Sequence, residues 1–354
     1  MRVRVAGKRH VVLALVGLAV LIAIALVCFS SRPRPDAQML ACVKLGDKWG
    51  YIDGHGSEHI EPKFDYASDF SEGLAMVQIN GKSGYIGWDG EYRIEPQFED
   101  GHDFSEGLAA VKLNGKVGAI NSTGNFIIQP QFEAVRTFTE GLAAVKSGDL
   151  WGYVDHDGSF VVAPRFEDAG VFAEGLAAVE LSGRWGYINQ HGDFSIAPRF
   201  SYAQPFSEGL AVVKTGSKAG FVNKTGTFVI KADAFDSAGG FHDGLAGVMI
   251  GTKWEYINKS GAIQVAPKYD LVGGFEQGLS AVEVAGKYGF VDGRGNLIIR
   301  MQYDLAGYFH HDFAPVQVAD KSGYIDKAGN VVIGLSYNDA CAFRTKDETT
   351  PFKN

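Results

Sequence analysis

The sequence is short of cysteine and of positive charge, and each shortage excludes a class of protein. Three cysteines among 354 residues are too few for a disulfide scaffold. The chain has 33 basic and 41 acidic residues, and setting aside the four basic residues before position 10 leaves 29 against 41, a net charge of about −12. Nucleic acids and anionic lipid surfaces call for basic patches. We therefore expect neither nucleic acid nor a lipid surface to be the partner of this part of the chain.

Motifs that carry catalysis are also missing. No serine lies in a nucleophile elbow, and no glycine-rich phosphate loop follows a strand and opens a helix. His55 and His59 are four residues apart, but an expected hairpin does not place them on one helical face. The eighth copy of the loop has His310, His311 and Asp312 where other units have the residues of the repeat. We interpret this as divergence of the repeat, and metal binding is the alternative. The sequence predicts no enzyme and no catalytic, cofactor-binding or metal-binding residues.

A membrane signal opens the chain. The uncharged apolar run from Val11 to Phe29 follows basic residues and, at nineteen residues, spans about 28 Å as a helix. Because positive charge flanks only its first side, we expect residues 1–10 in the cytoplasm and 11–29 as a transmembrane signal anchor of the bacterial inner membrane. A cleaved signal and lipidation at Cys28 are the alternatives. All three place the rest of the chain in the periplasm or outside the cell.

Beyond this segment the chain divides simply. Residues 30–38 contain two prolines, Pro33 and Pro35, and form a stiff linker that prevents the helix from continuing. No shift of composition interrupts residues 39–343, which we interpret as one domain. Residues 344–354 are expected to be a polar tail. A domain of this size exceeds the usual single core, unless it is built of repeats that pack only on their neighbours.

A repeat of about 34 residues organises the domain. Each unit carries a glycine after an aromatic or substituted position, and the series runs Gly50, Gly84, Gly118, Gly152, Gly186, Gly220, Glu255, Gly289 and Gly323. The seventh member is a glutamate and comes one residue late. Self-similarity at a fixed period of this size is typical of solenoids, propellers and arrays.

Each unit contains three strand candidates, so we expect an all-β fold of nine three-stranded antiparallel meanders. In the fifth unit these are 176–181, 185–188 and 194–197. Short turns such as Asn114-Gly115 join the first two strands. The turn between the second and third strands ends in glycine in every copy: Gly56, Gly90, Gly124, Gly158, Gly192, Gly226, Gly261, Gly295 and Gly329. Glycine enters the left-handed conformation that such a turn needs.

Strand composition favours a propeller-like toroid. The first strand has small residues, which suit a crowded axis, and the third ends in proline at Pro62, Pro96, Pro130, Pro164, Pro198 and Pro267. Because proline cannot donate to a ladder, the third strand is expected at the outer edge of each blade. Nine blades exceed the usual four to eight. An open β-solenoid or superhelix is therefore the alternative.

Aromatic residues recur twice in the loop between units. The first set is Phe64, Phe98, Phe132, Phe166, Phe200, Phe235, Tyr269 and Tyr303, and the second is Phe70, Phe104, Phe138, Phe172, Phe206, Phe241, Phe275 and Phe309. We expect them to fill the seams between units, with a ligand-stacking ladder as the alternative.

Two polar series invite a cation-binding interpretation. One is acidic in its first six members and is replaced by other residues in the last two: Glu72, Glu106, Glu140, Glu174, Glu208, Asp243, Gln277 and His311. The other lies in turns: Asp53, Asn121, Asp155, Asn189, Asn223, Asn258, Asp292 and Asp326. We expect the first series to cap the turns before Gly73 and its equivalents. Asp and Asn at the start of a turn bond their own backbone, and the later ligands of a calcium loop are absent.

The repeat resembles a known family. Lys48-Trp49-Gly50-Tyr51-Ile52-Asp53 with its echoes, and the Glu-Gly-Leu-Ala half of each unit, are similar to the bacterial WG, or KWG, repeat. The resemblance implies a β-repeat interaction module, often exported, with no catalytic residues to carry over. Several copies depart from it: Ser83, Val117, Ala219, Tyr288 and Ser322 replace the tryptophan, Ala119 the tyrosine and Glu255 the glycine.

These features predict a membrane-anchored module outside the cytoplasm that binds or scaffolds a protein partner at the cell envelope. The first alternative is a glycan or cell-wall binder that uses exposed aromatics as stacking platforms, namely Tyr66, Trp88, Tyr92 and Tyr202. The second alternative is an enzyme, which would require a group of residues that breaks the repeat.

Two further expectations concern single positions. Cys42 occupies the first copy of strand one, and Cys341 the loop of the last copy, so a closed ring would bring them together as a disulfide. The alternative is two unrelated small buried residues. The insertion and Glu255 in unit seven predict the weakest seam around residues 231–256.

Overall fold

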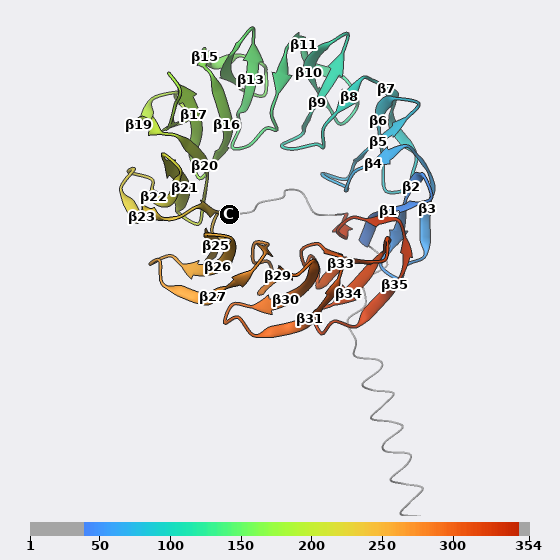
Figure 1. The fold of residues 1–354 in the computed structure, drawn as a ribbon. Helices are drawn as coiled ribbons and strands as arrows, with labels where there is room; N and C mark the ends of the chain where they lie inside the picture. The colour runs from blue at the N-terminus through green and yellow to red at the C-terminus, as the bar shows by residue number, and fades with distance from the viewer. Residues whose placement is uncertain (1–38, 347–354) are drawn as a thin grey trace, which may run out of the picture. The chain divides into compact units, whose positions relative to one another are not determined.

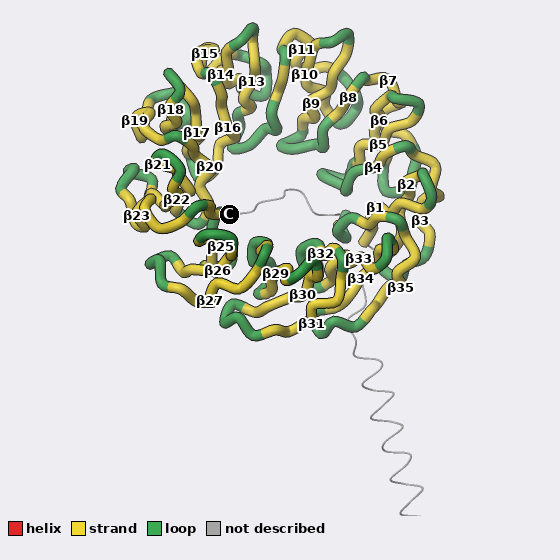
Figure 2. Tube along the Cα trace, viewed as in Figure 1, coloured by secondary structure: helices red, strands yellow, loops and turns green. Residues whose placement is uncertain are grey.

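The computed structural model describes residues 39–346. The expected cytoplasmic segment, membrane anchor and linker, and residues 347–354, lie outside the described residues. Within the described range, no helix is long and apolar enough to cross a membrane. The described chain forms eight four-stranded antiparallel sheets and one five-stranded sheet, arranged as nine blades around a ring (Figures 1 and 2). The all-β propeller expectation is confirmed, and the open solenoid is wrong.

Eight blades contain four strands and one contains five, rather than the three expected. The innermost strands are β4 (Tyr66–Ala67), β8 (Asp100–Gly101), β12 (Ala134–Val135), β16 (Asp168–Ala173), β20 (Tyr202–Ser207), β24 (Ser237–Ala238), β28 (Leu271–Val272), β32 (Leu305–Ala306) and β36 (Asp339–Ala340). Most are only two residues long. A strand this short shows no alternation of polar and apolar residues by which the sequence could predict it. They come from the loop that was expected to connect two units.

The expected first strand therefore lies second from the axis. Its copies are β1 (Met39–Leu45), β5 (Ala75–Ile79), β9 (Leu108–Leu113), β13 (Ala143–Ser147), β17 (Leu176–Leu181), β21 (Leu210–Thr215), β25 (Leu245–Ile250), β29 (Leu279–Val284) and β33 (Phe313–Val318). Small residues such as Ala177 and Ala178 are buried there between blades. They allow neighbouring sheets to approach each other, and the placement of this strand at the axis was wrong.

The remaining two strands match the expected order. The third position holds β2 (Lys48–Asp53), β6 (Lys82–Ile86), β10 (Lys116–Asn121), β14 (Leu150–Val154), β18 (Arg184–Ile188), β22 (Lys218–Asn223), β26 (Lys253–Asn258), β30 (Lys287–Asp292) and β34 (Lys321–Asp326). The outer edge holds β3 (Glu58–Phe64), β7 (Tyr92–Phe98), β11 (Phe126–Phe132), β15 (Phe160–Phe166), β19 (Phe194–Phe200), β23 (Phe228–Phe235), β27 (Ile263–Tyr269), β31 (Leu297–Tyr303) and β35 (Val331–Tyr337).

A bulge explains why the repeat needs its glycine. In the fourth repeat, Trp151 pairs with Phe166 while Tyr153 pairs with Val162, so β15 carries extra residues opposite Gly152. A Cβ on Gly152 would lie 2.5 Å from the Val162 carbonyl oxygen and 2.7 Å from the Pro164 nitrogen. A side chain fits at this position only if the facing backbone shifts. Proline is tolerated in the bulge, since the edge strand does not need its N–H.

Aromatic side chains fill the seams between blades, as expected. Tyr153 of one blade packs against Phe172 of the next with ring centroids 4.9 Å apart, and both are almost fully buried. The Tyr153 hydroxyl donates to the Gly170 carbonyl oxygen at 2.8 Å, which fixes the inner loop of the next blade. The turn glycines complete the seam, since Gly158 lies against Ile128 of the preceding blade.

The ring closes by pairing of its two ends. Strand β1 pairs with β36 and also with β37 (Arg344–Thr345), so the first blade takes its inner strands from the C-terminal end. The expected polar tail therefore begins later than residue 344. Gly56 of the first blade meets Ile333 of the ninth in the same contact that joins other blades. All nine blades are thus joined in one circle (Figure 1).

A disulfide joins Cys42 and Cys341 at this closure, with their Cα atoms 5.2 Å apart. The Cys341 amide also donates to the Cys42 carbonyl oxygen at 2.9 Å. The bridge and the backbone pairing therefore fasten the same two strands, β1 and the chain that follows β36.

Loss of the disulfide is expected to lower the stability of the ring. Joining positions 299 residues apart constrains the unfolded chain by roughly 5 kcal/mol in the chain-entropy model. We expect a thiol reductant to lower the thermal midpoint by about 10 °C. The matched control is Cys42→Ala/Cys341→Ala, whose midpoint should be low already and insensitive to reductant. An equal response of wild type and the double variant would contradict the prediction.

Glu255 is a local defect in the seventh blade. It replaces the glycine beside the bulge, is 1% exposed, and neither carboxylate oxygen has a hydrogen-bond partner among the described residues. Burial raises the pKa of this carboxyl. A buried acceptor without a partner costs about 1–3 kcal/mol. This supports the expectation that the seam around 231–256 is the weakest, which stays a prediction.

We expect Glu255→Gly to stabilise the protein by about 1–3 kcal/mol. Because the folded pKa is raised, the wild type loses stability as pH rises from the unfolded-state value of about 4.3 through the folded value. The advantage of Glu255→Gly over the wild type should therefore grow over that window, and so should that of Glu255→Gln, because neither replacement ionises. The difference in stability between the two variants should not change with pH. Thermal midpoints and hydrogen exchange across pH measure this. Slower exchange in residues 231–256 of the wild type than in the second to fifth blades would refute it.

Candidate binding site at the ring closure

The repeated acidic residues link one blade to the next. Each accepts a hydrogen bond from the backbone N–H of the equivalent turn in the following blade, as Glu140 does from Gly175 at 2.9 Å. The same contact is made by Glu72 to Gly107, Glu106 to Gly141, Glu174 to Gly209, Glu208 to Gly244, Asp243 to Gly278 and Gln277 to Asp312. They were expected to cap their own turns, but the turn is left-handed at the acid and points the side chain across the seam.

The Asp and Asn residues of the outer turns bond their own backbone, as expected. Asp155 Oδ1 accepts from the amides of Asp157 at 3.0 Å and Ser159 at 2.8 Å. Two histidines also serve local packing: His59 Nε2 lies 2.9 Å from the Trp88 carbonyl oxygen, and His156 stacks on Phe138. Neither set gathers ligands around a point.

The four candidate stacking residues divide into two pairs. Trp88 stacks on Phe70 with ring centroids 4.6 Å apart, and Tyr92 packs edge-on against Phe64. Both belong to the packing of the first and second blades. Tyr66 and Tyr202 are 44% and 41% exposed, and occupy the same position of the inner strand four blades apart. These two remain available to a ligand.

Side chains on the inner wall differ from blade to blade, although the backbone there is held in place. The two residues before each loop phenylalanine are Ser68-Asp69, His102-Asp103, Arg136-Thr137, Gly170-Val171, Gln204-Pro205, Gly239-Gly240, Gly273-Gly274, Gly307-Tyr308 and Cys341-Ala342. Only the second and third blades place a carboxylate here. The polar side of the wall therefore lies next to the ring closure.

A cavity of about 440 Å³ lies at this point. It is lined by the inner loops of the second and third blades, by Thr137 of the fourth, and by Arg344 of the closing strand. Tyr66 forms part of its wall. Ser68 Oγ donates to Asp103 Oδ1 at 2.5 Å, which joins the second blade to the third.

Charged groups cross the closure in a chain. Arg344 Nε donates to Asp69 Oδ2 at 3.2 Å, and Arg344 Nη1 lies 3.3 Å from His310 Nε2. His310 Nδ1 in turn lies 2.9 Å from Glu276 Oε1. An arginine donates at Nε2, so the Nδ1 proton is the one that faces Glu276. This arrangement connects the second blade to the loop before β29.

Burial raises the pKa of both Asp69 and Asp103. Arg344 works in the opposite direction on Asp69, as does the Ser68 hydroxyl on Asp103. Asp103 is exposed to solvent, whereas Asp69 is half-buried. The cavity therefore holds two carboxylates whose charge is only partly balanced by one arginine.

Sequence reasoning did not single out Asp69, Asp103 or Arg344. One feature of the sequence could have pointed to them. The two loop aromatics recur in almost every unit, whereas the two residues before the second aromatic differ from unit to unit. That contrast shows which positions break the repeat. It could not show that Arg344, more than 200 residues away, lies against Asp69, because ring closure brings it there.

The comparisons with known proteins follow the same repeat. The WG containing repeat family matches residues 49–82, 84–116, 118–151, 151–185, 185–218, 220–254, 256–288 and 288–321. The chain belongs to the WG containing repeat family. Its glycine and aromatic motifs are those that form the bulge and the seams. No curated protein matches the sequence.

One solved structure shares the fold at low identity, and a second matches more weakly. A crystal structure of a eukaryotic initiation factor is 11% identical, covers 90% of this chain and 100% of its own, and has a TM-score of 0.65. The dihydro-heme d1 dehydrogenase NirN is 14% identical over 89% of this chain and 77% of its own, with a TM-score of 0.49. At 11% identity the likeness to the initiation factor concerns the fold alone.

An experiment can decide whether the acidic residues that bond across the seams serve only as structural contacts or also bind a cation. We expect Glu140→Ala to lower the unfolding free energy by about 1 kcal/mol, since the Gly175 amide loses its acceptor. Glu140→Gln should cost less, because Gln277 already makes this contact with a neutral amide. Chemical denaturation with and without Ca²⁺ measures both. A stabilisation by Ca²⁺ that Glu140→Gln removes would favour the cation-binding alternative instead.

Proposed function

We propose that this WG-repeat ring is a binding module for a protein partner at the cell envelope, and that the cavity at the ring closure is its contact site. The observation that carries the proposal is the set of inner positions at which the residues differ from blade to blade. Glycines, aromatics and the acidic residues that bond across the seams maintain the blades, while the variable inner positions gather carboxylates, hydroxyls and Tyr66 around one cavity. A frame with variable side chains on one wall is how repeat proteins present a binding surface.

The charge of the cavity favours a basic partner. Asp69 and Asp103 outnumber Arg344, and the domain as a whole is acidic. A lysine or arginine side chain of a partner would meet both carboxylates, and Tyr66 would offer its ring face to the same cation. The long-range field of an acidic domain also speeds the approach of such a partner.

Anchoring at the bacterial inner membrane, with the ring on the periplasmic or outer side, is part of the proposal. It depends on the sequence of residues 1–29, which lie outside the described residues. The disulfide between Cys42 and Cys341 supports it, because such bonds persist in oxidising compartments and are rare in the cytosol.

A glycan or cell-wall polymer is the second candidate. The observation that favours it is Tyr66, which is 44% exposed beside two carboxylates and Trp49, with the Tyr66 and Trp49 ring centroids 5.9 Å apart. Sugars stack on such aromatic faces and bond to carboxylates beside them. Trp88 and Tyr92 no longer support this candidate, since each packs against a phenylalanine.

The test uses Tyr66 and its matched control Tyr202. A photoreactive residue at position 66 in intact cells should yield one major protein adduct, and the same residue at 202 should not. Asp103→Asn should reduce the yield at 66 at least tenfold, as the loss of one charge contact predicts. The yield should also fall as pH drops through the raised pKa values of Asp69 and Asp103, because neutral carboxyls do not attract a cation.

Other outcomes separate the alternatives. Adducts to peptidoglycan at position 66 would favour the glycan candidate. Equal yields at 66 and 202, or none, would overturn the contact site. The proposal assigns no reaction to the ring, so hydrolysis in a broad substrate screen that is abolished by Asp69→Asn would contradict it.

A further inference from the structure

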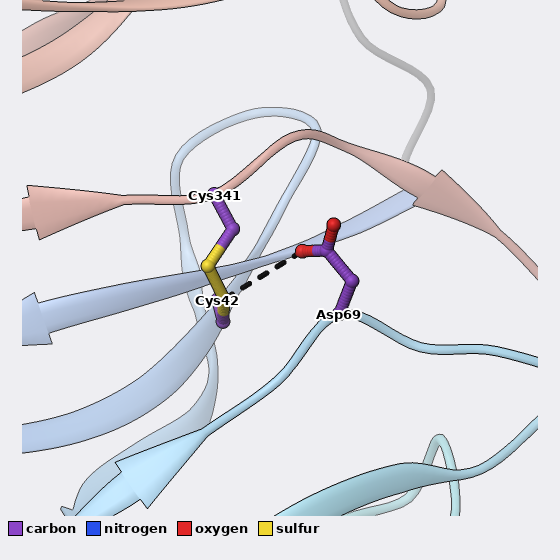
Figure 3. Close-up of side chains that lie close together, drawn as sticks. All are labelled: Cys42, Asp69 and Cys341. Atoms are coloured by element: carbon purple, nitrogen blue, oxygen red, sulfur yellow. Dashed lines mark hydrogen bonds between the residues drawn. A yellow bond between two sulfur atoms is a disulfide. The ribbon is translucent and has the colours of Figure 1, made fainter. Parts of the chain in front are cut away.

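The ring closure brings three metal-ligating side chains together. Cys42, Cys341 and Asp69 each place one ligand atom so that all three lie within 4.8 Å of one another (Figure 3). Cys42 comes from the first strand of the ring, Cys341 from the last inner loop, and Asp69 from the inner loop of the second blade. In the oxidised protein the two sulfurs are bonded to each other, so neither is a thiolate.

We propose that reduction of this disulfide converts the closure into a site for a thiophilic divalent cation such as Zn²⁺. A dithiol reductant transfers two electrons and two protons, which leaves thiols on Cys42 and Cys341 and a disulfide on the reductant. The cation then binds both sulfurs as thiolates and releases the two protons. The same two ends of the ring are held by metal in place of the covalent bond.

Distances favour this cation. Zn–S and Zn–O bonds of about 2.3 and 2.1 Å place tetrahedral S and O ligands about 3.6 Å apart. Cys42 Sγ and Asp69 Oδ1 are 3.7 Å apart in the structure (Figure 3). The sulfurs need about 3.8 Å between them in a tetrahedral site, and they must separate in any case once their bond is broken. Thiolates select zinc-like cations over Mg²⁺ and Ca²⁺.

The surroundings of Asp69 complete the site. Its second oxygen, Oδ2, accepts from Arg344 Nε at 3.2 Å, which holds the carboxylate with Oδ1 toward the sulfurs. Such outer contacts orient metal ligands. Two thiolates, one carboxylate, a divalent cation and the arginine sum to zero charge. Three protein ligands leave a fourth position, as in open zinc sites, and Asp69 lies on the wall of the cavity.

The experiment titrates Co²⁺, then Zn²⁺, into the full chain in detergent, with Cys28→Ser to remove the third thiol. After reduction by a phosphine we expect one Co²⁺ per chain with a thiolate charge-transfer band, displaced by Zn²⁺. The oxidised chain should show no band. Asp69→Asn keeps both thiols and should bind at least tenfold more weakly. Asp100→Asn, on the inner strand β8 and outside the lining of the cavity, should bind as the wild type does.

A second readout guards against loss of folding. Zn²⁺ should raise the thermal midpoint of the reduced chain and leave the oxidised chain and reduced Asp69→Asn unchanged. Binding by the oxidised chain, unchanged affinity in Asp69→Asn, or a reduced chain that unfolds or gives no band would each overturn the site. None of these outcomes bears on the protein partner, because that test uses the oxidised ring.

Discussion

Contact between one blade and the next is the interaction on which this structure depends. A single sheet of four short strands cannot bury both of its faces, so every blade relies on its two neighbours. Tyr153 and Phe172 show how this is done: one aromatic from each blade meets in the seam, and the tyrosine hydroxyl holds the next inner loop. Glu140 adds a hydrogen bond across the same seam on the side of the turns. A seam of this kind must also exist between the last blade and the first, which is why the ends pair.

The close approach of strands within a blade places a second constraint on the sequence. The bulge opposite Gly152 brings backbone atoms so close that any side chain there would require the backbone to shift. Glycine recurs at this position for that reason, and proline recurs in the bulge because an edge strand does not need its amide. Glu255 shows what an exception involves, since its carboxylate is buried without a partner among the described residues. The repeat motif of the family therefore reflects the packing requirements of the blades.

The proposed contact site lies at positions whose side chains vary from blade to blade. The inner loops are fixed by hydrogen bonds to their backbone, so their side chains can change without loss of the fold. Beside the closure these side chains are acidic and polar, and they share a cavity with a residue from the other end of the chain. The disulfide lies against the same cavity through Asp69. The candidate site therefore forms only when the two ends of the chain pair and close the ring.

The sequence alone determined the architecture of each unit. Period, turn glycines and edge prolines predicted the strands, the all-β class and the outer edge, because these features depend on local backbone rules. It missed the inner strand, whose two residues carry no periodic signal, and it assigned Arg344 to a tail. Only the tertiary structure decided that nine units close into a ring and that Asp69, Asp103 and Arg344 meet. These contacts depend on the small rotation from each blade to the next, summed around the whole ring, and no single repeat encodes that sum.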